Sequence, residues 1–258
     1  MSLAHAAAIV KRPNVTSDAF LGGRLSVSQP SDGFRAGLDS VLLGASTGHG
    51  AGDLLDLGAG VGTAALVALA GHEALSATLV ESDPRMAELA RTNIAANGFA
   101  ARAGVIDLDL TAPGRTRKSA GLAADRYASV IANPPFYEAG TVPARPRAAA
   151  RHMSPEALDI WVKTAATHAA PGGEIVFIHI AERLPALLHS FQSRFGAITI
   201  LPLTPREGEP AHRILIRGIK GSRAPLTLLA SRALHTPAGR TFRPEFDAIF
   251  RGQDRLHW

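Results

Sequence analysis

The chain has 258 residues, a hydrophobic content of 46% and a formal net charge of +5 at neutral pH, and it contains no cysteine. The missing cysteines exclude disulfides, thiolate catalysis and cysteine-ligated metal sites, and the histidines lack the close spacing of a metal site. No apolar run is long enough to cross a membrane, so we expect a cytoplasmic protein. Nearly all the cations are arginines, which favours phosphate-bearing partners, although a composition rich in Ala, Gly and Arg explains the same charge.

The first part of the chain, residues 1–50, is predicted to be an N-terminal extension that ends in a helix. Residues 1–20 are weakly patterned and are interpreted as a loose arm. Alternating apolar residues from position 20 to position 29 predict a short hairpin. A turn-rich polar stretch follows, after which Asp39 is predicted to cap a helix.

A glycine-rich turn follows a short buried strand predicted over residues 54–57. The turn contains Gly58, Ala59, Gly60 and Gly62. Glycine lets the backbone turn tightly and lets a ligand approach closely. The third glycine comes one position too early for the dinucleotide fingerprint, so we do not expect a pyrophosphate cradle. Asp56, just before the turn, favours a cationic ligand group such as an ammonium.

Acidic residues end the next two predicted strands. The strand over residues 77–81 ends in Glu81, followed by Ser82, and a carboxylate at this place can bind both ribose hydroxyls. The third strand ends near Asp107 or Asp109, either of which could accept a hydrogen bond from an adenine amino group. With Asp56, these acids describe a site for S-adenosylmethionine, a nucleoside with an amino-acid tail and a cationic centre. A structural turn with solvated acids is the alternative.

An Asn-Pro-Pro turn stops the fourth predicted strand, over residues 127–132, because proline cannot continue a sheet ladder. Asn133 and the Pro134 carbonyl can each accept one N–H of a planar NH2 group. Phe136 or Tyr137 can stack on the plane of that group; we favour Phe136 slightly. The alternative is a turn with no function beyond ending the strand. Asn133 is the first candidate for the catalytic residue.

Strands and helices alternate between residues 53 and 195, which predicts an α/β fold with a doubly wound, mostly parallel sheet. Residues 197–203 and 213–219 are interpreted as a final antiparallel pair. We expect one domain over residues 1–258, with its core in residues 51–258. Two predicted loops, over residues 111–126 and 138–153, are rich in arginines that could hold RNA phosphates, although as individual residues they are better explained as solvated side chains. These are Arg115, Arg117, Arg145, Arg147 and Arg151.

The glycine turn, Glu81 and the Asn133 turn together resemble class I S-adenosylmethionine-dependent methyltransferases that modify a planar nitrogen. Within that group, residues 29–44 and 206–220 are similar to segments of the bacterial tRNA1(Val) adenine-N6 methyltransferase family. The resemblance implies a Rossmann-like seven-stranded sheet with a reversed C-terminal hairpin, S-adenosylmethionine as cofactor and a tRNA adenine as substrate. Arg35 could line the methionine end of the cofactor pocket, although a surface arginine is equally compatible with the sequence.

The Asn-Pro-Pro-aromatic turn does not by itself identify the substrate, because methyltransferases that act on adenine N6, guanine N2 and protein glutamine share it. A protein glutamine-N5 methyltransferase, a small-molecule methyltransferase and a non-catalytic cofactor- or RNA-binding module therefore stay open as alternatives. No metal is expected in any of them.

Overall fold

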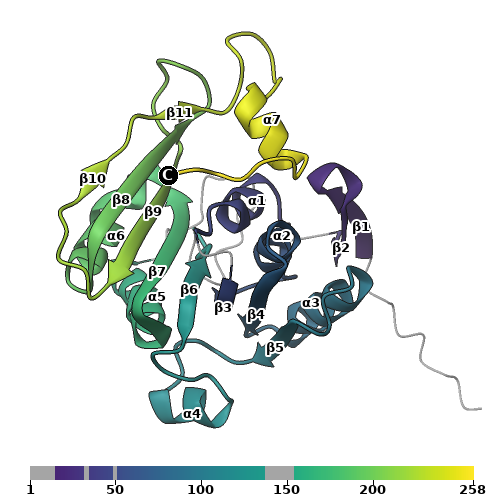
Figure 1. The fold of residues 1–258 in the computed structure, drawn as a ribbon, viewed down its shortest axis with the longest axis vertical. Helices are drawn as coiled ribbons and strands as arrows, with labels where there is room; N and C mark the ends of the chain where they lie inside the picture. Colours follow the sequence, from purple (N-terminus) through teal and green to yellow (C-terminus); the bar gives the residue numbers. More distant parts are fainter. Residues whose placement is uncertain (1–14, 32–34, 49–50, 137–153) are drawn as a thin grey trace, which may run out of the picture.

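The computed structural model of the protein describes residues 15–31, 35–48, 51–136 and 154–258. A central nine-stranded sheet dominates it (Figure 1). Its longer strands are β3 (Ala51–Leu57), β4 (Ala74–Glu81), β5 (Ala103–Asp107), β6 (Tyr127–Ala132), β7 (Ala169–Ile180), β8 (Phe195–Thr204) and β9 (Arg213–Lys220). Two short strands, β10 (Thr227–Leu228) and β11 (Arg232–Ala233), both pair with β8.

The strand order is β10-β8-β9-β7-β6-β3-β4-β5. All neighbours run parallel except β9, which is antiparallel to both β7 and β8. The predicted doubly wound sheet with a reversed C-terminal hairpin is therefore confirmed, and β10 and β11 extend it at one edge. The direction in which successive strands are added to the sheet reverses between β3 and β6. Ligands of such sheets bind beside this switch point, at the carboxyl ends of the strands.

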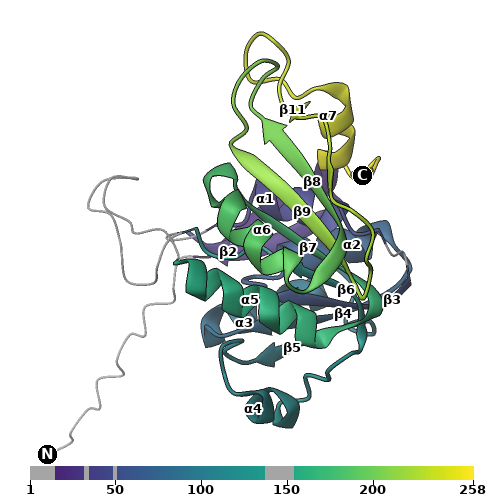
Figure 2. The same ribbon diagram turned by 90° about the vertical axis from the view of Figure 1, so that its left-hand side faces the viewer.

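Helices cover both faces of the sheet (Figures 1 and 2). They are α1 (Leu38–Ala45), α2 (Thr63–Gly71), α3 (Pro84–Ala96), α4 (Gly114–Ser119), α5 (Pro155–His168), α6 (Leu184–Gln192) and α7 (Pro244–Phe250), with 3-10 turns at Leu21–Gly23 and Ala181–Arg183. Side chains alternate along a strand, so Leu54 joins the core under α1, α2, α3 and α7, whereas Leu55 joins the core under α5 and α6. No described helix is long and apolar enough to span a membrane.

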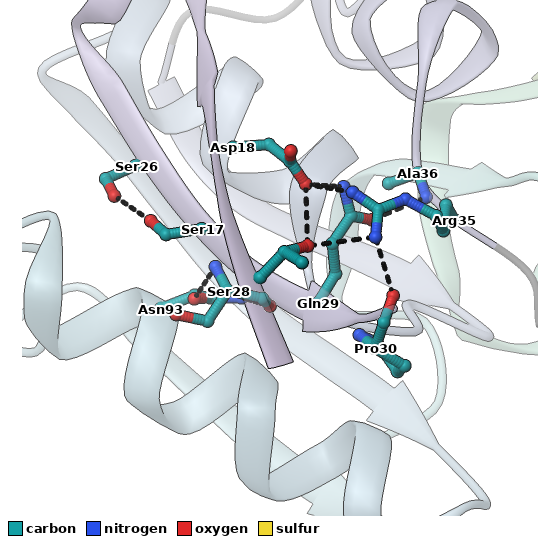
Figure 3. A network of polar contacts seen from close by, with 10 residues as sticks. Ser17, Asp18, Ser26, Ser28, Gln29, Pro30, Arg35, Ala36 and Asn93 are labelled. Carbon is teal, nitrogen blue, oxygen red and sulfur yellow. Dashed lines mark hydrogen bonds and ion pairs between the residues drawn. The ribbon is translucent and has the colours of Figure 1, made fainter. Parts of the chain in front are cut away.

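An N-terminal hairpin of β1 (Val15–Phe20) and β2 (Leu25–Pro30) stands apart from the main sheet. The second edge of β2 pairs with side chains and not with another strand. Asn93 of α3 bonds the backbone of Ser28 (Figure 3), and Asn97, the C-cap of α3, bonds the backbone of Ser26. The Asn93 amide also donates to the Val61 carbonyl at 3.0 Å. The hairpin is thereby attached to the glycine turn.

Several local predictions are wrong. Residues 15–20 form β1 and are not part of a loose arm, and the predicted loop over residues 111–126 contains α4. Gly37 is the N-cap of α1, so Asp39 lies in the first turn and does not cap the helix.

Candidate active site

The carboxyl ends of β3, β4, β5 and β6 border a cleft of about 640 Å³. In the sheet register, Leu57 lies opposite both Val80 and Ala132. The residues that follow these three, Gly58, Glu81 and Asn133, therefore come together, and all three line the cleft. Residues up to 75 positions apart in the sequence, from Gly58 to Asn133, are brought to one edge by parallel pairing alone.

The glycine turn forms the floor of the cleft. Gly58, Gly60 and Gly62 have φ angles of +65°, +56° and +86°, a region that side chains with a Cβ rarely adopt. A Cβ on Gly58 would collide with the Trp161 ring, and one on Gly62 would lie 2.8 Å from the Leu79 side chain. Gly62 also serves as the N-cap of α2. The turn thus needs glycine both for its conformation and for close packing.

Asp56 lines the same cleft, although only 2% of its surface is exposed. Its Oδ2 accepts a hydrogen bond of 3.2 Å from the Ala65 N–H in the first turns of α2. Burial raises the pKa of Asp56 to about 7; the Ala65 bond opposes this shift and the nearby Glu81 carboxylate adds to it. Among the described residues, the Ala65 N–H is the one donor to this carboxylate, which suits it to a cationic ligand group.

The Glu81 carboxylate holds the glycine turn in place through hydrogen bonds. Its Oε2 accepts from the Gly60 N–H, and its Oε1 accepts from the N–H groups of Ser82 and Asp83, each at 2.8 Å. The carboxylate is therefore held in a fixed orientation between β3 and β4. Its oxygens retain lone pairs for the hydroxyls of a bound sugar. Ser82, also predicted as a site residue, lines the cleft beside it.

The structure separates the two aspartates that follow the third strand of the doubly wound sheet. Asp107 forms an ion pair with Arg91 on α3 and is not part of the cleft lining, whereas Asp109 lines the cleft. The Asp109 Oδ1 accepts from the N–H and the hydroxyl of Thr111, both at 2.8 Å. Asp109 is therefore the acid with access to a ligand.

The Asn133 turn forms the opposite wall. Asn133, Pro134 and Phe136 all line the cleft, with Pro134 buried and the other two half-buried. In the described part of the chain, the Asn133 side chain has no hydrogen-bond partner, so its oxygen can accept one from a ligand. The Phe136 ring packs against His179 and Arg213 on its protein side.

Other predicted residues lie elsewhere. Arg35 does not line the cleft; its guanidinium bonds the Asp18 carboxylate and the Pro30 carbonyl and holds the hairpin in place (Figure 3). Arg117 donates to the carbonyls of Leu110 and Ala112 and so folds its own loop, while Arg115 is exposed on α4. Tyr137, Arg145, Arg147 and Arg151 lie outside the described residues.

Sequence reasoning missed Trp161 on α5, which lines the cleft against Gly58 and is 8% exposed. The chain has only two tryptophans, and this one follows the Asn133 turn on the next helix. Its rarity and its place were the available signal. Its indole closes the floor of the cleft and prevents any residue but glycine at position 58.

These residues fit S-adenosylmethionine. Asp56 would hold the ammonium of the amino-acid tail, Glu81 the ribose hydroxyls and Asp109 the adenine amino group, while the glycine turn admits the ligand close to the backbone. The wall between the acids is apolar, with Val80, Leu108 and Leu110, as a flat base requires.

A family model for the methyltransferase small domain matches residues 39–201. The chain belongs to this family. It is 30% identical to a tRNA1(Val) (adenine(37)-N6)-methyltransferase of Porphyromonas gingivalis over 66% of this chain and 68% of that protein. A protein of the same name from Vibrio vulnificus is 26% identical over 80% and 84% of the two chains.

Solved structures agree with this membership. A predicted O-methyltransferase of Agrobacterium tumefaciens is 31% identical, with a TM-score of 0.72 over 84% of this chain and 98% of that one. The T. thermophilus 16S rRNA N2 G1207 methyltransferase, solved with AdoMet and guanosine, shares the fold with a TM-score of 0.53 at 21% identity, over 80% and 50% of the chains. This methyltransferase small-domain protein is an S-adenosylmethionine-dependent enzyme, and the predicted family, fold and cofactor are confirmed.

Proposed function

We propose that this enzyme methylates the exocyclic N6 of an adenine in RNA, with tRNA as its substrate. The observation that carries the proposal is the pair of acceptors, the Asn133 side chain and the Pro134 carbonyl, on the cleft wall beside Phe136. The names of the relatives in Porphyromonas and Vibrio support adenine and tRNA as the acceptor.

The chemistry follows from these acceptors. An exocyclic amine is a weak nucleophile because its lone pair is delocalised into the ring. Asn133 and Pro134 each accept one of its hydrogens, which directs the lone pair out of the ring plane and toward the cofactor side of the cleft, while Phe136 stacks on the base. Bound S-adenosylmethionine supplies the electrophilic methyl group. No strong base is needed, because the proton can leave to solvent after transfer.

Arginines are proposed to hold the RNA backbone. Arg115 is exposed on α4, and Arg145, Arg147 and Arg151 follow the Asn133 turn in the sequence. Arg117 contributes less, because its guanidinium is already bonded to two carbonyls. If these residues bind phosphates, the logarithm of the binding constant for RNA falls linearly with the logarithm of salt concentration, and each arginine removed reduces that slope by about 1.

The test measures transfer of labelled methyl groups to tRNA, followed by mass spectrometry of the nucleosides. We expect N6-methyladenosine in the wild type, and a loss of at least about 100-fold in Asn133→Ala with cofactor affinity retained. Asn97→Ala, at the C-terminal end of α3 and outside the cleft lining, serves as the control and should stay active. Undiminished transfer in Asn133→Ala would refute the proposed mechanism. Label in a ribonuclease-resistant protein band would instead identify a glutamine methyltransferase, and cofactor binding without any transfer would identify a non-catalytic module.

A further inference from the structure

Phe136, the aromatic residue of the Asn133 turn, is held from its protein side by two side chains. The guanidinium carbon of Arg213 lies 4.8 Å from the centre of the Phe136 ring. The imidazole of the fully buried His179 lies 5.0 Å away, tilted by 54°. A cation over a ring face is attracted by the ring quadrupole, so Arg213 restricts how the Phe136 ring can turn.

Arg213 is itself fixed. Its Nε donates to the Asp39 Oδ2 at 2.9 Å and its Nη1 to the His212 carbonyl at 3.2 Å. The two side chains of the ion pair are 30% and 20% exposed, so the pair is only partly screened by solvent. Two bonds on a planar fork leave the guanidinium one orientation. The order of contacts is therefore Asp39 to Arg213 to Phe136.

Phe136 lines the cleft, whereas Asp39, Arg213 and His179 do not. His179 and Arg213 lie against Phe136 from outside the cleft lining, and Asp39 lies behind Arg213. We infer that Asp39 and Arg213 are positioning residues, which hold Phe136 as a rigid stacking surface for the acceptor base. This inference rests on the proposed function, since it assigns Phe136 that role. Asp39, Arg213, His179 and Phe136 are called the clamp below.

The clamp combines the two sequence segments in which the resemblance to the tRNA1(Val) adenine-N6 methyltransferase family lies. Asp39 belongs to the segment at residues 29–44, and Arg213 belongs to the segment at residues 206–220. Both segments meet at the turn that presents the two acceptors. The clamp thus contributes to acceptor choice, because a ring that cannot turn accepts a flat base in one orientation only.

The first experiment needs no substrate. 4-Fluorophenylalanine replaces the ten phenylalanines of the chain, and Phe136→Leu identifies the resonance of position 136. We expect Arg213→Gln to shift or broaden that resonance. Arg232→Gln, which breaks an ion pair of 2.8 Å with Glu245 at similar exposure, should leave it unchanged. An unchanged resonance in Arg213→Gln overturns the inference. Should that variant not fold, Arg213→Lys, which keeps the charge but loses the planar fork, gives the same readout.

The second experiment is a double-mutant cycle on methyl transfer. Arg213→Gln should lower kcat about tenfold, which is the effect of losing a partly desolvated cation–π contact, with cofactor Kd changed less than about twofold. Asp39→Asn should have a smaller effect of the same kind. In a Phe136→Leu background, Arg213→Gln should cost less than about twofold, because both changes remove the same contact. Fully additive losses overturn the inference.

Two further outcomes are distinguishable. A higher KM for RNA with a reduced salt slope and unchanged kcat would make Arg213 a phosphate ligand and overturn its role in the clamp. If the wild-type chain transfers no methyl group to RNA, the proposed function fails, and the fluorine resonance still decides whether Arg213 holds Phe136.

Discussion

Asp56→Asn tests whether the cofactor site is built at the expense of stability. The pKa of this buried carboxyl is raised from 3.8 to about 7, chiefly by burial. In the unfolded chain the group ionises near its ordinary value, so between these two pH values the folded state binds more protons. The free energy of unfolding therefore falls as pH rises through this window. An amide cannot ionise, so the Asp56→Asn variant would not show this fall.

The size of the effect follows from the two pKa values. Relative to a group that stays neutral, Asp56 costs about 2 kcal/mol of stability at pH 5 and about 4 kcal/mol at pH 8. The amide introduced by Asp56→Asn can still accept the Ala65 N–H, although its NH2 group needs a partner of its own and costs a constant amount at every pH. The pH dependence is thus the informative quantity. The stability of the variant relative to the wild type should rise by about 2 to 3 kcal/mol from pH 5 to pH 8.

Urea unfolding of both proteins, without cofactor, at pH 5 and pH 8 measures this difference. Asp53→Asn is the control on the same strand: the Ser76 hydroxyl, aided by Arg126 and opposed by burial, lowers the pKa of Asp53. Its replacement should therefore cost about the same at pH 5 and pH 8, because the stabilisation by a lowered pKa is lost only below the ordinary value of 3.8. A difference between Asp56→Asn and wild type that is the same at both pH values would refute the reasoning. Cofactor affinity should fall in Asp56→Asn, because the counter-charge for an ammonium is lost.

Further substitutions test the walls of the cleft by urea unfolding and cofactor titration. Gly58→Ala should cost about 2 to 4 kcal/mol, since its Cβ meets Trp161, whereas Gly60→Ala, with nothing within 4 Å, should cost only about 1 kcal/mol for its positive φ. Equal costs would contradict the packing argument. Asn93→Ala should cost about 2 to 3 kcal/mol and weaken cofactor binding, because it frees the Val61 carbonyl of the glycine turn. Asn97→Ala should leave cofactor affinity unchanged; a loss as large as in Asn93→Ala would contradict the coupling.

The cleft lining around the glycine turn could be predicted because its signals are local. Glycines that allow a tight turn follow directly on a buried strand, and each acid stands at the end of its own strand. Parallel pairing then puts Gly58, Glu81 and Asn133 at one edge. The choice between Asp107 and Asp109 could not be made from the sequence, because it depends on the ion pair with Arg91 on a neighbouring helix.

The elements that the sequence failed to predict carry little apolar periodicity. β1 is mostly exposed. Its hairpin is held against α3 by hydrogen bonds between Asn93 and the backbone of Ser28. α4 has no buried residue, and Arg117 ties it to the preceding loop through the carbonyls of Leu110 and Ala112. Such elements are determined by polar contacts with distant residues. Hydrophobic patterning, the main signal in a single sequence, does not predict such elements.

The reversed strand β9 explains why the side chains behind Phe136 could not be predicted from local sequence signals. Because β9 runs antiparallel to β7, its first residue, Arg213, pairs with Ile180 at the carboxyl end of β7. A parallel strand would place its last residue there. The reversed direction of β9 therefore places its first residue at the edge of the sheet that borders the cleft, where Arg213 contacts Phe136 and Asp39. Consecutive strand-end turns thus build one wall of the cleft, while the reversed strand decides which side chains stand behind Phe136 on the other.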